Sequence, residues 1–456
     1  MEKFKASLCL LPALFLPFAG FSQTTTNGDS TLYRWATQEY MLGDWDGARP
    51  WLSSHGVDFE FFYAGSRPQN FAGGLRIGGA YQGAGFATLD LDSEKLLGYE
   101  GGTLHVSGLW LSGQKPFSAV YSGDLNRVNL LDFPNALRLG ELWYQQKFFG
   151  SKLTVKFGEL SIDSDFIVPE YYSSMCQFTL LNQTFFYPSL PYNVFGVPGF
   201  PATTHGLSTT PYATPGTVIR WSPSDKFYAQ YGLYSGSPDQ SAAGVQFPVS
   251  RADGALNYLE LGFDRNHGTN NPGLGGGYKI GAYYHTSSYP DAYQGVLYAA
   301  GLAPAPPWHD GNYGVYLLAE QQLYLAHGKA DPAQRGLTGF VRALGAPADR
   351  NLMQMELDGG LVYRGLIPTR DWDTLALAGS YLETSHDIAN AQRTINAMAP
   401  GSFVPVDYEG VIELDYKVQA TAWWTVQGSL QHVFHPGGSA ATRDATVFIL
   451  QTSLRF

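Results

Sequence analysis

The sequence has few charged residues for its length. Only 15% of its 456 residues are Asp, Glu, Lys or Arg, against about 25% in an average soluble domain. The 28 basic residues are outnumbered by 39 acidic ones, giving a net charge of −11, which argues against a nucleic-acid-binding protein with its basic face. Because 15% of the residues are aromatic, the chain is also unlike disordered segments, which contain few aromatics.

Cysteine is nearly absent, with only Cys9 and Cys176. Cys9 lies in an N-terminal stretch typical of a secretory signal, because two lysines precede an apolar run over 8–18 and small residues follow at 19–22. We expect residues 1–22 to be removed as a signal peptide. A single cysteine then remains, so the sequence predicts neither an internal disulfide nor a thiol cluster for a metal.

Long apolar runs are also lacking. No run of 18 apolar residues follows residue 22, which excludes membrane-spanning helices. Apolar and polar residues instead alternate with a period of two, which is typical of β-strands. We predict sixteen strands, one from residue 57 and the others near 81–92, 103–112, 137–148, 152–158, 216–222, 227–234, 257–264, 278–286, 312–324, 336–343, 354–363, 373–384, 409–418, 421–434 and 444–456.

Alternating strands have two interpretations. In water the apolar face packs on another sheet, whereas in an outer membrane it meets lipid and the polar face lines a wet lumen. Sixteen strands over roughly 434 residues give about 27 residues per strand, which fits ~10 spanning residues with alternating short and long loops. Aromatic residues also gather at strand ends, as at 148–149 and 423–424, where an interfacial girdle needs them. The sequence therefore predicts an all-β fold, a 16-stranded antiparallel transmembrane β-barrel over 57–456.

The last predicted strand runs to the end of the sequence. Phe448, Leu450, Leu454 and Phe456 fall on one of its faces. A terminal aromatic residue on such a strand resembles the assembly signal of outer-membrane proteins. We therefore expect outer-membrane lipids and the barrel assembly machinery to be partners of the chain.

Two segments are not strand-like. In the N-terminal periplasmic segment 23–56, Asp44 or Asp46 is expected to cap a short helix that runs through Ser54. Residues 159–215 are rich in Pro, Gly, Tyr and Phe, and a structureless loop of that length is uncommon. We predict that this loop folds into the lumen and constricts the pore.

Local motifs suggest what the pore carries. The segment 42–58, which begins LGDWDGAR, resembles the opening LGDWGG-R-x-x-L-x-x-x-G-I-x-F of the OprB-type carbohydrate-selective porins. Further matches follow in the family's order at 139–146, 156–166, 214–230 and 413–438. The resemblance covers nearly the whole mature chain. It implies a 16-stranded barrel with a short N-terminal periplasmic helix and the diffusion of sugars.

A sugar offers hydroxyl groups and an apolar ring face. A selective pore should therefore present charged or amide groups together with an aromatic plate. The sequence departs from the family at Asp46 and Ala48, and it has Gln114-Lys115-Pro116 where the family often has an arginine, which bears on the charge at the constriction. The residues that we predict to contact sugars are Lys115, Arg138, Glu141, Trp143, Gln145, Lys147, Glu159, Asp163, Asp165, Arg220, Tyr228 and Gln230.

Catalytic motifs are absent. The sequence contains no G-x-S-x-G, no H-E-x-x-H and no Walker loop, so we expect no enzyme activity, no cofactor and no metal. The favoured function is passive diffusion of sugars such as glucose across an outer membrane. A general porin for small hydrophilic solutes is the alternative, and a barrel that supports an enzyme or adhesin, or a soluble β-sandwich lectin, is less favoured. The preferred sugar, and a monomer or homotrimer, stay open.

Overall fold

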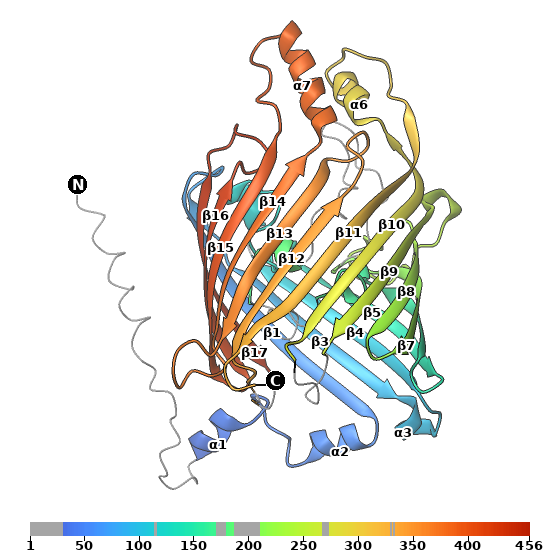
Figure 1. Cartoon of the computed structure of the whole chain (residues 1–456), viewed down its shortest axis with the longest axis vertical. Coiled ribbons are helices and arrows are strands. Elements are labelled where there is room, and N and C mark those ends of the chain that lie inside the picture. The colour runs from blue at the N-terminus through green and yellow to red at the C-terminus, as the bar shows by residue number, and fades with distance from the viewer. Residues whose placement is uncertain are drawn as a thin grey trace, which may run out of the picture.

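The computed structural model describes residues 31–113, 116–169, 179–186, 210–266, 273–328, 331 and 333–456. Sixteen long strands form one antiparallel sheet, in which neighbours in the sequence are neighbours in space (Figure 1). A further two-residue strand, β2 (Gly78–Gly79), pairs with β1. The long strands are β1 (Val57–Ala72), β3 (Gln82–Asp92), β4 (Gly102–Gly113), β5 (Ala136–Phe148), β6 (Leu153–Leu160), β7 (Thr214–Ser224), β8 (Phe227–Ser235), β9 (Ala255–Arg265), β10 (Gly276–Pro290), β11 (Trp308–Leu325), β12 (Gly336–Gly345), β13 (Met353–Arg364), β14 (Thr374–Thr384), β15 (Tyr408–Thr421), β16 (Trp424–Phe434) and β17 (Ala445–Arg455).

The sheet closes on itself. Its first and last strands, β1 and β17, pair in a register that sets Phe62 opposite Arg455 and Asn70 opposite Val447. Within the described residues, each long strand therefore has a partner on both sides. Closure removes the unpaired N–H and C=O groups of an open edge, which a membrane does not tolerate. The predicted closed 16-stranded antiparallel barrel is confirmed.

The alternation of residues separates the two faces of the wall as predicted. In β15, Ile412 and Leu414 are 50% and 45% exposed, whereas Glu413 and Asp415 are fully buried. The exposed apolar side chains belong to the outward face, which meets lipid in a membrane. The buried carboxylates belong to the inward face, where they contact loops that fold into the barrel.

Parts of two long loops fill the barrel. Phe117 and Val128 of the loop between β4 and β5, and Leu181 of the loop between β6 and β7, pack with Val411 and Val447 of the wall. The inner face is therefore apolar at this contact, whereas carboxylates of the same face contact the loops elsewhere. Short helical turns in these two loops are η2 (Ser118–Ser122), η3 (Ile162–Ser164) and α5 (Gln183–Phe186). A further turn, η5 (Arg251–Asp253), lies between β8 and β9.

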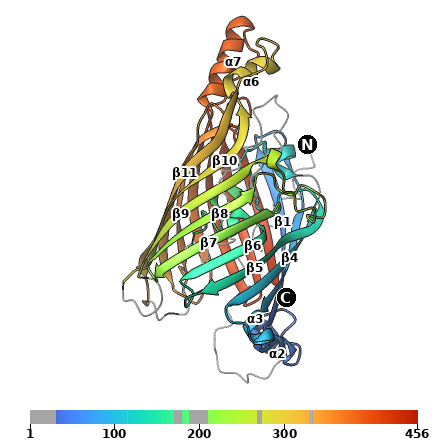
Figure 2. The same cartoon turned by 90° about the vertical axis from the view of Figure 1, so that its right-hand side faces the viewer.

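Helices lie at the two ends of the barrel. Helices α6 (Ala292–Ala299) and α7 (His386–Met398) pack together and project from one end, whereas α1 (Thr31–Thr37), α2 (Ala48–Ser54) and α3 (Ser93–Leu97) lie at the other (Figures 1 and 2). Short turns face the periplasm in outer-membrane barrels and long loops face outward. The end with α2 and α3 is therefore the periplasmic end. Among the described residues, no helix is long and apolar enough to cross a membrane.

The N-terminal segment begins α2 without an acidic cap. Gly47, at a left-handed φ of +88°, precedes the helix, and no side chain caps it. The expected cap by Asp44 or Asp46 is wrong, because Asp46 itself adopts a left-handed φ of +55° in the turn that leads into the helix. Glycine accepts this backbone conformation without strain from a Cβ atom.

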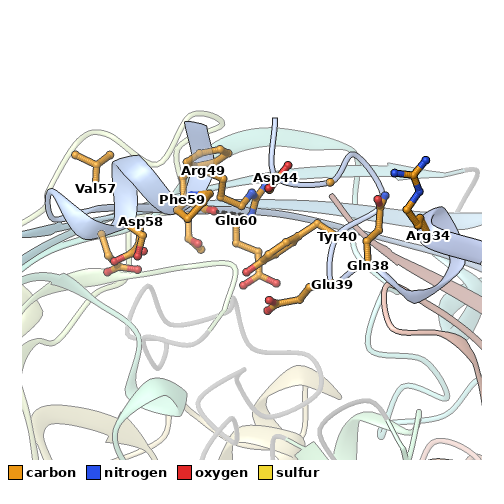
Figure 3. A pocket seen from close by; sticks show the side chains of 15 residues that line it. Arg34, Gln38, Glu39, Tyr40, Asp44, Arg49, Val57, Asp58, Phe59 and Glu60 are labelled. Carbon is orange, nitrogen blue, oxygen red and sulfur yellow. Dashed lines mark hydrogen bonds between the residues drawn. The ribbon is translucent and has the colours of Figure 1, made fainter. Parts of the chain in front are cut away.

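Arg49 fastens this segment to the strands that close the barrel. Its Nη2 donates to the carbonyl oxygen of Phe456 at 2.8 Å, and its Nη1 donates to that of Phe59 at 3.4 Å. Its guanidinium lies 3.7 Å from the ring centre of Tyr40, beside Phe59 (Figure 3). The N–H of Met41 adds a hydrogen bond of 2.8 Å to the carbonyl oxygen of Arg455. The segment thus lies across the seam between β1 and β17.

Replacing Arg49 with alanine is expected to loosen this seam. The substitution removes two hydrogen bonds from a charged donor, each worth roughly 1.5–3 kcal/mol when well formed, and the contact with Tyr40. The temperature at which the barrel loses its heat-modifiable mobility on gels should fall by several degrees. Arg34→Ala, at an exposed position of the same segment, serves as the control. An unchanged transition for Arg49→Ala would show that the segment does not stabilise the seam.

Candidate functional site

Carboxylates on the inner wall bind the backbone of the loops inside the barrel. Glu413 accepts hydrogen bonds from the N–H of Leu181 at 2.6 Å and from that of Asn182 at 3.0 Å. Glu409 accepts one from the N–H of Leu125 at 2.7 Å. Both carboxylates are fully buried, so each needs such donors to offset the cost of removing a charged group from water.

Two more glutamates hold the first part of the loop between β6 and β7. Glu141 accepts from the N–H of Ser161 at 2.7 Å. Glu260 accepts from the N–H of Ile167 at 3.0 Å. Glu141 was predicted to contact sugar, and the structure also makes it an anchor of the loop. The prediction missed Glu260.

A buried ion pair holds a later part of the same loop. Arg342 donates to Asp358 at 3.0 Å, and both side chains are almost wholly buried. The same guanidinium donates to the carbonyl oxygen of Thr184, and the Thr184 hydroxyl donates to Glu356 at 2.6 Å. Breaking one partner of such a pair would leave an uncompensated buried charge. The loop is therefore fixed at several points along the wall.

Several predicted residues meet around Glu260. Tyr228 and Gln230 both donate to its carboxylate, at 2.8 and 3.0 Å. Gln230 also donates to the carbonyl oxygen of Asp165 at 2.6 Å. Arg220 lies over the Tyr228 ring at 3.6 Å from its centre. Because Tyr228 is only 2% exposed, this group supports the loop more directly than it meets a solute.

Asp165 and Trp143 are both next to Lys156. The Asp165 carboxylate pairs with the Lys156 ammonium at 2.6 Å, and that ammonium lies 5.0 Å from the centre of the Trp143 ring. His105 stacks on Trp143, with ring centres 4.6 Å apart and planes within 10°. The indole N–H faces Glu141 at 3.4 Å. The predicted aromatic plate is thus already covered in part by protein groups.

Arg138 and Glu159 form a separate group with Asp239. Arg138 donates to the carbonyl oxygens of Asp239 and Ser241, at 2.6 and 3.1 Å. Glu159 is buried and has Arg138 and Asp239 as its charged neighbours. Gln145 is half-buried and lies opposite Lys156 in the pairing of β5 with β6. Lys147 is exposed near the end of β5, and Lys115 lies outside the described residues.

A cavity of about 350 Å³ lies between the inner wall and the two loops. One part of its lining is apolar, including Phe86, Leu109 and Phe133, and another part carries His105 and Ser164 together with Glu141. The lining of the cavity therefore includes both hydrogen-bonding groups and ring and aliphatic carbons. This pairing matches the hydroxyls and the apolar face of a pyranose ring.

A second pocket, of about 630 Å³, lies at the periplasmic end beside Arg49. Figure 3 shows the carboxylates of Asp58, Glu60 and Glu39 on one side of it. Glu60 pairs with Arg455 at 2.6 Å. The periplasmic mouth is therefore acidic next to the seam.

Asp163 lies in the short turn η3 after β6, and its pKa is strongly shifted. Burial raises its pKa most, the hydrogen bond from the Thr210 N–H lowers it and the nearby charge of Glu141 raises it, and together these effects bring the pKa to about 7. The neutral form is therefore populated near physiological pH. The charge inside the barrel changes with pH at this position.

Three comparisons show which known proteins this chain is similar to. The family model described as carbohydrate-selective porin, OprB family, matches residues 76–456. Porin B of Pseudomonas aeruginosa is 27% identical over 428 residues, which cover 90% of this chain and 89% of that protein. The high-pH structure of Pseudomonas putida OprB superposes with a TM-score of 0.82 at 24% identity and covers 92% of this chain and 99% of the other. That likeness shows the fold.

Glu413→Ala is expected to release the loop from the wall. The N–H groups of Leu181 and Asn182 would lose a charged acceptor, at a cost of about 1–3 kcal/mol for each buried group left unpaired. Open-channel current noise in planar bilayers should rise, and the mean conductance should rise with it. Glu383→Ala, on another strand of the same sheet, is the control. Traces as quiet as those of the unmodified protein would show that Glu413 does not restrain the loop.

Asp163 should make the selectivity and the stability of the barrel depend on pH. Because its folded pKa lies above the ordinary 3.8, the folded state binds a proton between about pH 4 and 7 that the unfolded state does not bind. This residue therefore adds stability as the pH falls through that window. As the pH rises through 7 the lumen gains a negative charge, and reversal potentials should shift toward cation selectivity.

Asp163→Asn tests this dependence. The variant should lose most of the shift in reversal potential between pH 5 and 9, whereas Asp225→Asn, in the short turn between β7 and β8, should keep it. If Asp163→Asn kept the full shift in reversal potential, another titrating group would be responsible for it.

Proposed function

Because the chain belongs to the OprB family of carbohydrate-selective porins, it is a channel rather than an enzyme, and we propose that monosaccharides such as glucose cross it by passive diffusion. No energy source and no cofactor enter this mechanism. The porin fold and the relatives place such a channel in an outer membrane. A lumen narrowed by loops would admit small sugars in single file.

The observation that supports this function most directly is the cavity along β3, β4 and β5, whose lining holds both polar and apolar groups. A sugar would set its apolar face on Phe86 and Phe133 and turn its hydroxyls to His105, Ser164 and Glu141. Ser164 already donates to Glu141 at 3.0 Å, so a sugar hydroxyl would exchange for a bond of similar kind. A sugar held by such an exchange would be bound weakly and could be released.

Selectivity would then come from several weak contacts in series. A charge that faces water is screened, so no single residue supplies much binding free energy. Passage requires leaving as well as entering, which favours weak sites over one tight site. Of the predicted contacts, we propose Glu141 and Asp163 as those that meet the sugar, and we propose that Arg220, Tyr228, Gln230 and Asp165 set the shape of the pore.

The route to the membrane is part of the proposal. We propose that residues 1–22 are cleaved as a signal peptide and that the barrel assembly machinery recognises β17 with Phe456. Outward-facing Phe448 and Leu450 support this, since both belong to the apolar face of that strand.

Sugar block of single-channel current tests the proposal. Glucose added to a bilayer that holds one channel should reduce the ion current in a saturable way. Ser164→Ala should raise the half-blocking concentration roughly two- to tenfold, because a lost neutral hydrogen bond is worth ~0.5–1.5 kcal/mol. Phe133→Ala should raise it as well, because the sugar ring would lose apolar contact area. Leu137→Ala, at a position that is 75% exposed, should leave it unchanged.

The general-porin alternative gives a different result. If glucose and maltose fail to reduce the current even at high concentration, the channel has no sugar site and passes small hydrophilic solutes without selection.

A further inference from the structure

An exposed apolar surface lies at the periplasmic end, on one side of the barrel. It is formed by α2, by α3 and the residues after it, and by the turn between β5 and β6. We call it the rim patch. Its most exposed members, Leu97 and Phe149, are 83% and 78% exposed. The rim patch comprises Trp51, Leu96, Leu97, Tyr99, Phe148 and Phe149.

Hydrogen bonds join the three elements into one surface. The Lys95 ammonium of α3 donates to the carbonyl oxygen of Ser53 in α2 at 2.9 Å. The N–H of Lys147 in β5 donates to the carbonyl oxygen of Gly101, which follows α3, at 2.9 Å. Figures 1 and 2 both show α2 and α3 side by side below the strands. The elements that carry the rim patch are therefore held together.

The barrel itself does not cover this surface. Neither α2 nor α3 contains a buried residue, although a short helix in water needs packing of an apolar face for its stability. Phe149 is held at the tip of its turn with a left-handed φ of +55°, an uncommon conformation for a bulky side chain. Covering these apolar groups with an apolar environment would lower the free energy of the protein.

The surface continues the lipid-facing wall. Phe148 ends the outward row of β5 that contains Tyr144, and Phe157 of β6 stands next to Tyr144, with ring centres 5.8 Å apart. Phe157 is 50% exposed. Aromatic residues in such a row mark the boundary between lipid and water. The rim patch continues this boundary from the periplasmic end of β5 onto α3 and α2.

The charges around the rim patch match a phospholipid headgroup. Lys95, Lys147 and Lys152 are exposed at its border, and Glu94 and Glu100 lie among them. Lysines at a membrane surface hold their ammonium groups at the level of the phosphates while their stems lie along apolar surface. The two carboxylates would meet the ammonium of a zwitterionic headgroup.

From this continuity and these charges, we propose that the rim patch inserts into the headgroup region of the inner leaflet of the outer membrane and binds phospholipids there. The occupant is a lipid surface rather than a periplasmic protein. Helix α2 carries Arg49, so the contact would also hold the N-terminal segment against the seam. The membrane would then take part in keeping the barrel closed.

The test places a polarity-sensitive fluorophore on the patch. In a full-length chain with Cys9→Ser and Cys176→Ser, Leu97→Cys is labelled and the protein is reconstituted into vesicles of phosphatidylethanolamine and phosphatidylglycerol. A spin label on the lipid headgroups quenches nearby probes. Met398→Cys, in α7 at the opposite end and 57% exposed, is the matched control.

If the proposal holds, the probe at position 97 is quenched by the headgroup label roughly threefold more than the probe at 398, emits at shorter wavelength and is shielded from iodide in the water. Phe149→Cys should behave as Leu97→Cys does. Equal quenching and equal access of iodide at 97 and 398 would overturn the proposal. So would shielding of position 97 in cells but not in pure lipid vesicles, because that result would assign the rim patch to a protein partner.

Discussion

The hydrogen bond between a wall carboxylate and a loop N–H is the interaction on which the interior of this barrel depends. A carboxylate removed from water needs donors, and a loop backbone removed from water needs acceptors. Glu413, Glu409, Glu260 and Glu141 meet both needs at once. Each bond fixes a point of a loop relative to a rigid strand. The inside of the barrel is thereby given a shape that its strands alone would not provide.

This arrangement also explains how a porin interior can hold both apolar packing and polar contacts. Where a loop brings side chains such as Phe117 or Leu181 to the wall, the wall offers valine and isoleucine. Elsewhere a cavity remains between the loops and the wall, and its lining includes both Phe133 and His105. In the proposed function the positions of the loops would define the path of the sugar, so the anchors of the loops would matter as well as the groups that a sugar would touch.

The outside of the barrel depends on a second constraint, the demand of the membrane for a closed sheet with an apolar exterior. Pairing of β1 with β17 satisfies the backbone, and the segment carrying Arg49 covers the seam. The motif around Gly47 and Arg49 that links the sequence to its family thus has a structural reason. Gly47 permits the left-handed turn, and Arg49 reaches the carbonyl oxygen of Phe456.

The sequence by itself determined the elements that follow from a local period. Alternation predicts each of the sixteen strands and the two faces of β15 and β17, because a period of two is a property of neighbouring residues. Closure into a barrel is predicted from the strand count, the aromatic residues at strand ends and the family resemblance. Alternation also placed Glu141 on the inward face of its strand. The tertiary structure alone decided what that inward face meets. Nothing local to 257–264 shows that Glu260 would receive a hydrogen bond from Ile167, about ninety residues away, or that His105 and Lys156 would cover Trp143. Such contacts join residues distant in the sequence, and they exist only after closure of the wall and entry of the loops bring them together.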